Sequence, residues 1–149
     1  MRAVIQRCLR ADVRVSGEIR GHVERGFVIL LGVSVDDTTE DARVMAEKVT
    51  NLRVFEDAGG LMNLSLRDVA GGVLLVSQFT LLGDARKGRR PSFIAAARED
   101  VAKPLYERVG ELLERETIPV EYGVFGADME VELVNHGPVT ILLDTKKTF

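Results

Sequence analysis

The sequence predicts an α+β fold in which two to three helices pack on a mixed or antiparallel, barrel-like β-sheet. Three observations predict it: apolar residues alternate with polar ones along much of the chain, two regions change to a helical period, and the predicted strands follow one another through short connections rather than regular β-α-β units. A chain of 149 residues with 46% hydrophobic residues can bury a core without disulfides or metals. We therefore expect one domain, residues 1–149.

The first third of the chain predicts three strands joined as a β-meander. Residues 1–9 and 12–16 alternate between apolar and polar side chains, which is typical of strands with one buried face. Residues 16–18, Ser-Gly-Glu, form a turn signal after the second segment. Residues 26–35 are almost entirely apolar, so we expect a buried strand there.

The period changes to that of a helix in residues 36–55. Four apolar residues recur at helical spacing and share one face: Ala42, Met45, Val49 and Leu52. Thr38 precedes them as a candidate N-cap, and acidic residues crowd the first turn, where they interact favourably with the helix dipole.

Strand and helix signals alternate again in the middle of the chain. Residues 61–66 and 71–82 have the apolar patterns of strands. A second helical region follows, with Pro104 suited to a first helical turn. Its apolar face is made, in order, by Phe93, Ala96, Ala97, Leu105, Val109 and Leu112. We expect this region to pack on the sheet.

The last third is again predicted to be β. Residues 118–125 form one candidate strand, and two alternating strands flank Gly137 and Pro138. Proline cannot donate a hydrogen bond to a sheet ladder, and a Gly-Pro peptide bond is one of the few places where the cis form is accessible. The residues alone leave open whether this dipeptide has a function.

The amount and distribution of charge bear on whether the chain binds nucleic acid. The net charge of −3 argues against a broad nucleic-acid-binding surface. The basic residues are nevertheless unevenly spread, since four cations fall within residues 86–90: Arg86, Lys87, Arg89 and Arg90. These four residues either belong to a solvated loop or contact the phosphates of a nucleic-acid end.

Cysteine and histidine are too scarce for a metal site. The chain has one cysteine, Cys8, and two well-separated histidines, His22 and His136, so we expect neither a disulfide nor a structural metal. Cys8 is expected to be a buried apolar thiol in the first strand rather than a reactive one. No apolar run approaches a membrane span, and the first residues do not resemble a signal peptide, so we expect a cytoplasmic protein without a membrane partner.

Candidate chemistry is concentrated in residues 71–82. Ser77, Gln78 and Thr80 interrupt an otherwise apolar segment, and buried polar groups must be hydrogen-bonded or face a cavity. No G-x-S-x-G elbow surrounds Ser77, and no histidine–acid pair is placed by sequence to activate Ser77 or Thr80. The phosphate-binding and dinucleotide-binding glycine motifs are absent as well.

Two motifs together resemble the D-aminoacyl-tRNA deacylases, enzymes that hydrolyse D-amino acids from mischarged tRNA. They are "SQFTL" at residues 77–81 and "NHGPVT" at residues 135–140. The start "AVIQR", the segment "KGRRPSF" at 87–93 and "GVFGADMEVELVNHGPVT" at 123–140 are similar to the same family, and the length matches one family domain.

The resemblance implies a homodimer with a filter that acts across subunits. Gly137 and Pro138 would form a cis dipeptide that enters the pocket of the partner subunit, where main-chain carbonyls face the chiral centre of the substrate. A backbone wall cannot relax by changing rotamer, so it would exclude the misplaced Cβ of an L-amino acid. Arg7 would brace this segment by donating to backbone carbonyls; taken alone, Arg7 is typical of a surface cation.

The resemblance also assigns roles around the pocket. Ser77 and Gln78 would bind the carbonyl end of the aminoacyl group, and the Phe79 N–H could contribute to an oxyanion site. Thr80 lacks the adjacent base that a nucleophile needs, so hydrolysis is expected to depend on help from the terminal ribose 2′-hydroxyl. Phe125 and Met129 would hold the terminal adenine, although both could instead only pack in the core.

The function implied by the resemblance is hydrolysis of the ester bond of D-aminoacyl-tRNA, and of glycine mischarged on a non-cognate tRNA, without metal or cofactor. The partners would be the tRNA 3′ end and a second copy of the chain, with no DNA. Two alternatives stay open from the residues: a non-catalytic module that binds an RNA 3′ end, and a general esterase with Ser77 or Thr80 as nucleophile.

Overall fold

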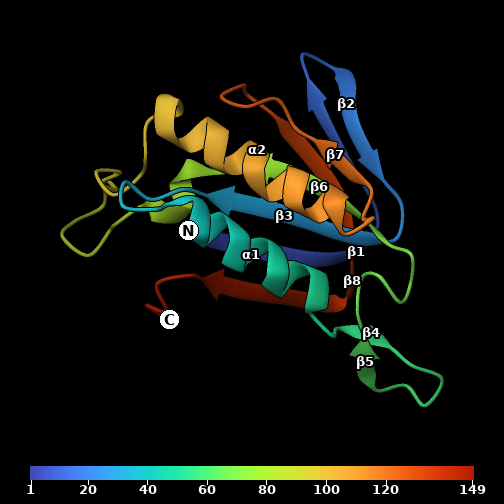
Figure 1. The fold of residues 1–149 in the computed structure, drawn as a ribbon. Helices are drawn as coiled ribbons and strands as arrows, with labels where there is room; N and C mark the ends of the chain where they lie inside the picture. Colours follow the sequence, from blue (N-terminus) through green and yellow to red (C-terminus); the bar gives the residue numbers. More distant parts are fainter.

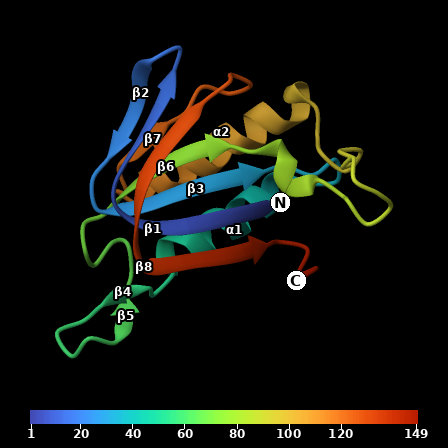
Figure 2. The same cartoon turned by 180° about the vertical axis from the view of Figure 1, so that it is seen from behind.

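The computed structural model describes all residues 1–149 and shows a mixed six-stranded sheet with two helices on one face (Figure 1). The opposite face carries no helix (Figure 2). The elements are, in chain order, β1 (Arg2–Val15), β2 (Glu18–Val23), β3 (Gly26–Gly32), α1 (Thr39–Asn51), β4 (Phe55–Glu56), β5 (Met62–Leu64), β6 (Gly72–Ser77), the 3₁₀ turn η1 (Phe79–Leu82), α2 (Glu99–Arg115), β7 (Val120–Tyr122) and β8 (Glu130–Asp144).

The sheet has the order β2-β1-β3-β6-β7, with β8 on the other edge of β1. The long strand β1 pairs antiparallel with β3 through its first half, with β2 through its second half and with β8 along most of its length. The pairs β3–β6 and β6–β7 are parallel. The sheet curls until β2 lies close to β6 and β7, so it forms a nearly closed barrel, and the predicted mixed, barrel-like architecture is confirmed.

Two apolar clusters fill the two sides of the sheet. The larger cluster lies between the sheet and the helices and includes Phe27, Ile29 and Leu31 of β3. The smaller one lies inside the curl and includes Cys8 and Val28. Because β3 is covered on both faces, its sequence is apolar at nearly every position rather than alternating. Cys8 is fully buried and burial raises the pKa of its thiol to about 11, as expected for an unreactive thiol.

The first predicted helix is confirmed. Thr38 is the N-cap of α1, and the Asp41 carboxylate accepts a hydrogen bond from the Thr38 N–H at 2.9 Å. Met45 and Val49 are buried against the core. Leu52 lies just beyond the helix, as its C-cap.

The second predicted helix begins later than expected. Residues 93–97 are not helical, because the N–H of Val35 donates to Ala95 O and the N–H of Ala97 donates to Val33 O. These bonds hold the segment beside the end of β3 as a turn, in which the Ala96 N–H donates to Phe93 O at 3.0 Å. Pro104 is the sixth residue of α2 rather than part of its first turn.

Four predicted strand boundaries are also wrong. Residues 1–16 contain one strand, β1, which lies between β2 and β3, so the first third is not a meander. The buried strand predicted for residues 26–35 ends at Gly32. The strand predicted for residues 71–82 ends at Ser77. The two strands predicted around Gly137 and Pro138 are one strand, β8.

Membrane insertion through a helix has no support, since neither helix combines the length and the apolar character that a bilayer span requires.

The close contact between β3 and β6 requires glycine at residue 26, which has no side chain. A Cβ on Gly26 would lie 1.9 Å from the carbonyl oxygen of Gly72, its partner in the parallel pair. We expect Gly26→Ala to lower the free energy of unfolding by about 3 kcal/mol or more, the upper end of overpacking effects, because backbone must move. Urea unfolding at fixed protein concentration measures it.

Gly59→Ala is the matched control, since Gly59 is exposed and a Cβ there would meet only the Asp57 side chain, at 3.3 Å. Its effect should stay within about 0.5 kcal/mol. Equal midpoints for the two variants would show that β3 and β6 can separate without cost.

Candidate active site

The polar residues after β6 lie on a turn at the end of a buried strand. The Gln78 N–H donates to Leu31 O at 2.8 Å, and the Leu81 N–H donates to Gln78 O at 3.2 Å, so the turn is anchored to β3. Phe79 opens η1, and the first N–H groups of a helical turn have no partner inside it. Only Ser77 of the "SQFTL" motif therefore belongs to the strand, and the Phe79 N–H is free to bind a ligand.

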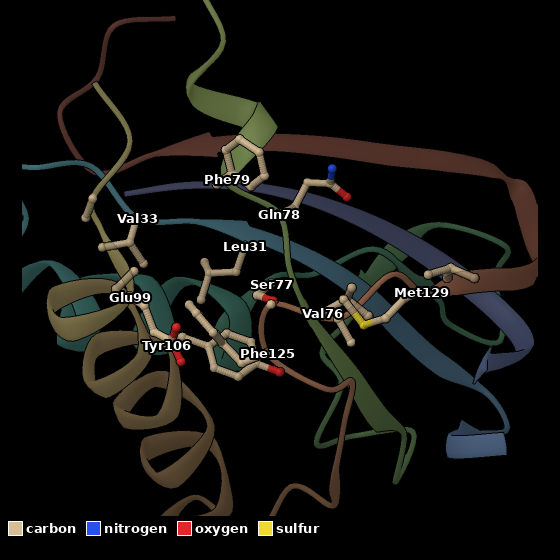
Figure 3. Close-up of a pocket in the computed structure, with 15 residues that line it drawn as sticks. Leu31, Val33, Val76, Ser77, Gln78, Phe79, Glu99, Tyr106, Phe125 and Met129 are labelled. Atoms are coloured by element: carbon tan, nitrogen blue, oxygen red, sulfur yellow. The ribbon is translucent and has the colours of Figure 1, made fainter. Parts of the chain in front are cut away.

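A cavity of about 410 Å³ opens beside this turn (Figure 3). Its volume lies in the usual range of small-molecule sites, roughly 300–1,000 Å³. Its walls come from the end of β3, from Val76 to Phe79, from α2 and from residues 125–131. The structure thus brings together five of the predicted site residues: Ser77, Gln78, Phe79, Phe125 and Met129. Thr80 lies outside the cavity wall.

Phe125 and Met129 are held at the edge of the core. The Phe125 ring packs edge-on against Tyr106, with the ring centroids 5.6 Å apart. The Met129 sulfur lies where Gly123 has no side chain, since a Cβ on Gly123 would be 2.8 Å from it. Both side chains are half-buried and line the cavity. They therefore contribute to core packing and also offer an apolar surface to a ligand.

No protein base is placed next to a nucleophile. The Thr80 hydroxyl accepts a hydrogen bond from the Gln78 amide, and neither Ser77 nor Thr80 has a histidine or carboxylate partner. His22 is bonded to Asp12 and Glu24 on the β1–β2 hairpin. The geometry does not provide the triad that a serine or threonine esterase requires.

Tyr106 and Glu99 also line the cavity, and neither was expected to do so from the sequence. The Tyr106 hydroxyl donates to Leu75 O at 2.7 Å, and burial raises its pKa well above the usual value, so it is a structural donor rather than an acid at neutral pH. Its position one residue after Leu105 on the apolar face of α2 could have indicated it. Glu99 is the only carboxylate of the cavity wall, and nothing in the sequence distinguishes it from the other acids.

The segment that contains Gly137 and Pro138 is a bulge in β8. The β1 residues Gln6 and Cys8 pair with Thr140 and Asn135, so the single residue Arg7 faces residues 136–139. The Gly137-Pro138 peptide bond is cis, and both residues are exposed. Neither lines the cavity of its own chain.

Arg7 is buried beneath this bulge. Its side chain is 3% exposed; Nε donates to His136 O at 3.1 Å, and Nη1 donates to Val54 O at 2.6 Å. The interpretation of Arg7 as a surface cation is therefore wrong, because its polar atoms are satisfied by carbonyls of distant segments. Gly137 has φ +119°, and a Cβ there would lie 2.9 Å from Arg7 Nη2, so only glycine fits without strain.

The basic residues 86–90 lie on a loop closed by two hydrogen bonds. The backbones of Asp84 and Ser92 donate to each other, both at 2.8 Å. Arg86 donates to both carboxylate oxygens of Asp84, at 2.8 and 2.6 Å, and this pairing lowers the pKa of Asp84. Arg86 is the one cation of this loop with an ion-pair partner in the chain. The other three cations are exposed: Lys87, Arg89 and Arg90.

Comparison with known proteins adds independent information. Residues 4–144 match the family model described as D-Tyr-tRNA(Tyr) deacylase. A protein of Anaeromyxobacter dehalogenans named D-aminoacyl-tRNA deacylase is 58% identical over all 149 residues and 100% of its own length. A Thermus aquaticus protein of the same name is 56% identical, covering 99% of this chain and 97% of the relative.

Two solved structures share the fold. The "c-Myc DNA Unwinding Element Binding Protein" is 42% identical, with a TM-score of 0.91 over 97% of this chain and 99% of that chain. A probable eukaryotic D-amino acid tRNA deacylase is 20% identical, with a TM-score of 0.80 over 95% of this chain and 97% of that chain, and shows likeness of fold alone. With a family model covering nearly the whole chain and full-length relatives above 50% identity, this chain belongs to the D-Tyr-tRNA(Tyr) deacylase family.

Proposed function

We propose that residues 1–149 form the single domain of a homodimeric D-aminoacyl-tRNA deacylase. The enzyme hydrolyses the ester between a D-amino acid and the tRNA 3′ end and releases the free amino acid and tRNA, with no metal or cofactor. Family membership and the names of full-length relatives support the reaction. The observation that supports locating this reaction in the chain is the cavity that Ser77, Gln78 and Phe79 line together with Phe125 and Met129.

The substrate would lie with its terminal adenine against Phe125 and Met129 and its ester beside Ser77 and Gln78. An aromatic face and a polarisable thioether suit a base, while hydroxyl and amide groups suit the carbonyl end of the aminoacyl group. The Phe79 N–H would then donate to the oxyanion that forms when water attacks the ester carbon.

Water rather than a side chain would be the nucleophile. Water attacks the ester carbon, the oxyanion collapses, and the ribose 3′-oxygen leaves with the proton that water gives up. The ribose 2′-hydroxyl of the substrate would relay this proton, because the cavity offers no histidine and both candidate hydroxyls lack a base.

Discrimination between enantiomers would depend on Gly137 and Pro138 of a second subunit. These exposed residues lie outside their own cavity, so they can act only if they enter another one. In a two-fold dimer, each bulge would enter the cavity of the partner, because the two contacts are equivalent by symmetry. Arg7 would hold the bulge through its bond to His136 O.

A second candidate function is a non-catalytic nucleic-acid-binding module. It is favoured by the 42% identical structure, which is named for binding a DNA element. Turnover separates the two functions, since a module would bind aminoacyl-tRNA stoichiometrically and release no amino acid.

The filter should exclude a misplaced Cβ without requiring a D side chain. We therefore expect Gly-tRNA to be hydrolysed at a rate much nearer to that of D-Ala-tRNA than to that of L-Ala-tRNA, and D-Tyr-tRNA to be accepted as well. Release of amino acid from the four substrates under one set of conditions measures it. If Gly-tRNA is as inert as L-Ala-tRNA, the pocket grips the D side chain instead.

The same preparation provides the control for the arrangement across subunits. Light scattering at the assay concentration should give about twice the chain mass of 16.4 kDa. A fully active and selective monomer would contradict a filter supplied by the partner.

If water is the nucleophile, Thr80→Ala should keep most of the wild-type activity. Replacing the terminal adenosine by 2′-deoxyadenosine, with the amino acid on the 3′-oxygen, should slow hydrolysis by roughly 10²- to 10⁴-fold, the usual value of acid–base help. Single-turnover rates with both substrates measure this. An inactive but folded Thr80→Ala, together with normal hydrolysis of the deoxy substrate, would make Thr80 the nucleophile.

If the basic loop contacts phosphates, the double variant Lys87→Glu/Arg89→Glu should raise KM for D-aminoacyl-tRNA. The slope of log KM against log salt should fall by about 1.4 to 1.8 units for two lost contacts. Hydrolysis of D-aminoacyl-adenosine, which lacks those phosphates, should not change. The double variant Arg20→Glu/Lys48→Glu, at two exposed cations outside the loop, changes the net charge equally and serves as the control. An equal rise in KM for this variant would show that the overall charge, not the loop, is responsible.

A further inference from the structure

Two phenylalanine rings form an exposed pair beside the cavity. Phe79 is 57% exposed and Phe93 is 36% exposed, and their rings meet edge to face with centroids 5.1 Å apart. The role proposed above for Phe79 uses only its backbone N–H, and Phe93 has no role so far. Two large apolar rings left in contact with water at a site entrance are typical of a binding surface.

The chain holds this pair in place. A Cβ on Gly83 would lie 3.0 Å from Cε1 of Phe93, so the absence of a side chain at residue 83 lets the Phe93 ring lie against the backbone. The next residues on each side, Asp84 and Ser92, are joined by two backbone hydrogen bonds. Phe93 therefore stands at the closed base of the basic loop, and its ring is positioned before any ligand binds.

The pair connects the cavity wall, through Phe79, to the base of the loop that carries the free cations, through Phe93. Phe79 is itself part of the cavity wall, at its edge in Figure 3. Beyond the Asp84–Ser92 bridge the same loop carries Lys87, Arg89 and Arg90, none of which has an ion-pair partner in the chain. A polyanionic strand with its end in the cavity would cross the two rings on its way to these cations.

We propose that Phe79 and Phe93 form a stacking platform for the base of the penultimate nucleotide of the tRNA 3′ end. This inference rests on the proposed function, which places the terminal adenosine in the cavity. Aromatic side chains next to cations are the usual means of holding single-stranded RNA, because every base has a face that can stack and every phosphate has a charge. A second copy of the chain is the less suitable occupant, because the adjoining loop is cationic and unpaired.

Substrates of increasing length test the platform. Phe93→Leu keeps an apolar side chain but removes the ring, so it should raise KM for D-aminoacyl-tRNA and for the D-aminoacyl ester of cytidylyl-adenosine by roughly 5- to 100-fold. D-aminoacyl-adenosine has no penultimate base and should be hydrolysed at the wild-type rate. Phe149→Leu makes the same change at an exposed ring that packs over Arg2, away from the cavity wall, and should leave all three substrates unaffected.

A substrate change tests the same contact with the wild-type protein. With an abasic penultimate residue in the tRNA, the KM of the wild type should rise by the same factor as Phe93→Leu raises the KM for intact tRNA. The KM of Phe93→Leu should not rise further on the abasic substrate. If Phe93→Leu raised KM equally for D-aminoacyl-adenosine and for D-aminoacyl-tRNA, the platform would be overturned and Phe93 would belong to the cavity. An unchanged KM for every substrate, or a loss accompanied by dissociation of the dimer, would overturn it as well.

Direct binding separates this inference from the proposed function. The probe is an oligoribonucleotide with 2-aminopurine at the penultimate position and a non-hydrolysable D-aminoacyl amide at its 3′ end. Stacking on an aromatic ring should quench its fluorescence with the wild type and not with Phe93→Leu. A wild type that hydrolyses D-aminoacyl-tRNA but does not quench the probe would refute the platform alone, whereas a wild type inert toward all D-aminoacyl substrates would refute the proposed function.

Discussion

Most of the fold takes its position from β1, which is hydrogen-bonded on both edges. Its first half pairs with β3, its second half with β2, and β8 runs along the other edge. A shift of any partner by one residue would turn alternate side chains away from the cores they fill, so the three registers constrain one another. The curl that brings β2 near β6 and β7 follows from this shared strand.

Arg7 occupies the break in this pairing that lies opposite Gly137 and Pro138, the residues of the proposed filter. A guanidinium that is 3% exposed must be hydrogen-bonded, and here its partners are carbonyls of His136 and Val54. Removing the Arg7 side chain would leave the two carbonyls without their donor. Displacing the carbonyls would leave the buried guanidinium without its hydrogen bonds. The position of the β8 bulge is therefore coupled to β1 and to the segment before β4, although the bulge itself is exposed.

In the proposed reaction, the cavity would bind and orient the substrate rather than supply a reacting group. Its polar groups are a hydroxyl, an amide and a backbone N–H at the end of β6, while its remaining surface is mainly apolar. The Gln78 N–H is bonded to Leu31 O, so the position of the adjacent Phe79 N–H is fixed by the fold. In the proposed reaction, this N–H would stabilise the oxyanion without having to reorganise. A site of this kind suits a substrate that brings its own proton relay.

The sequence by itself determined the class of the fold, the apolar faces of α1 and of the later part of α2, and the residues of the two motifs, because burial of one face leaves a local period. Only the tertiary structure decided that residues 93–97 form a turn beside the end of β3, that β1 separates β2 from β3, and that Arg7 is buried. The spacing of Phe93, Ala96 and Ala97 mimics a helix, but their backbone is bound by the end of β3. Hydrogen bonds to distant segments leave no period in the sequence, and so the partners of Arg7 and the exposed Phe79–Phe93 pair emerge only when the chain is folded.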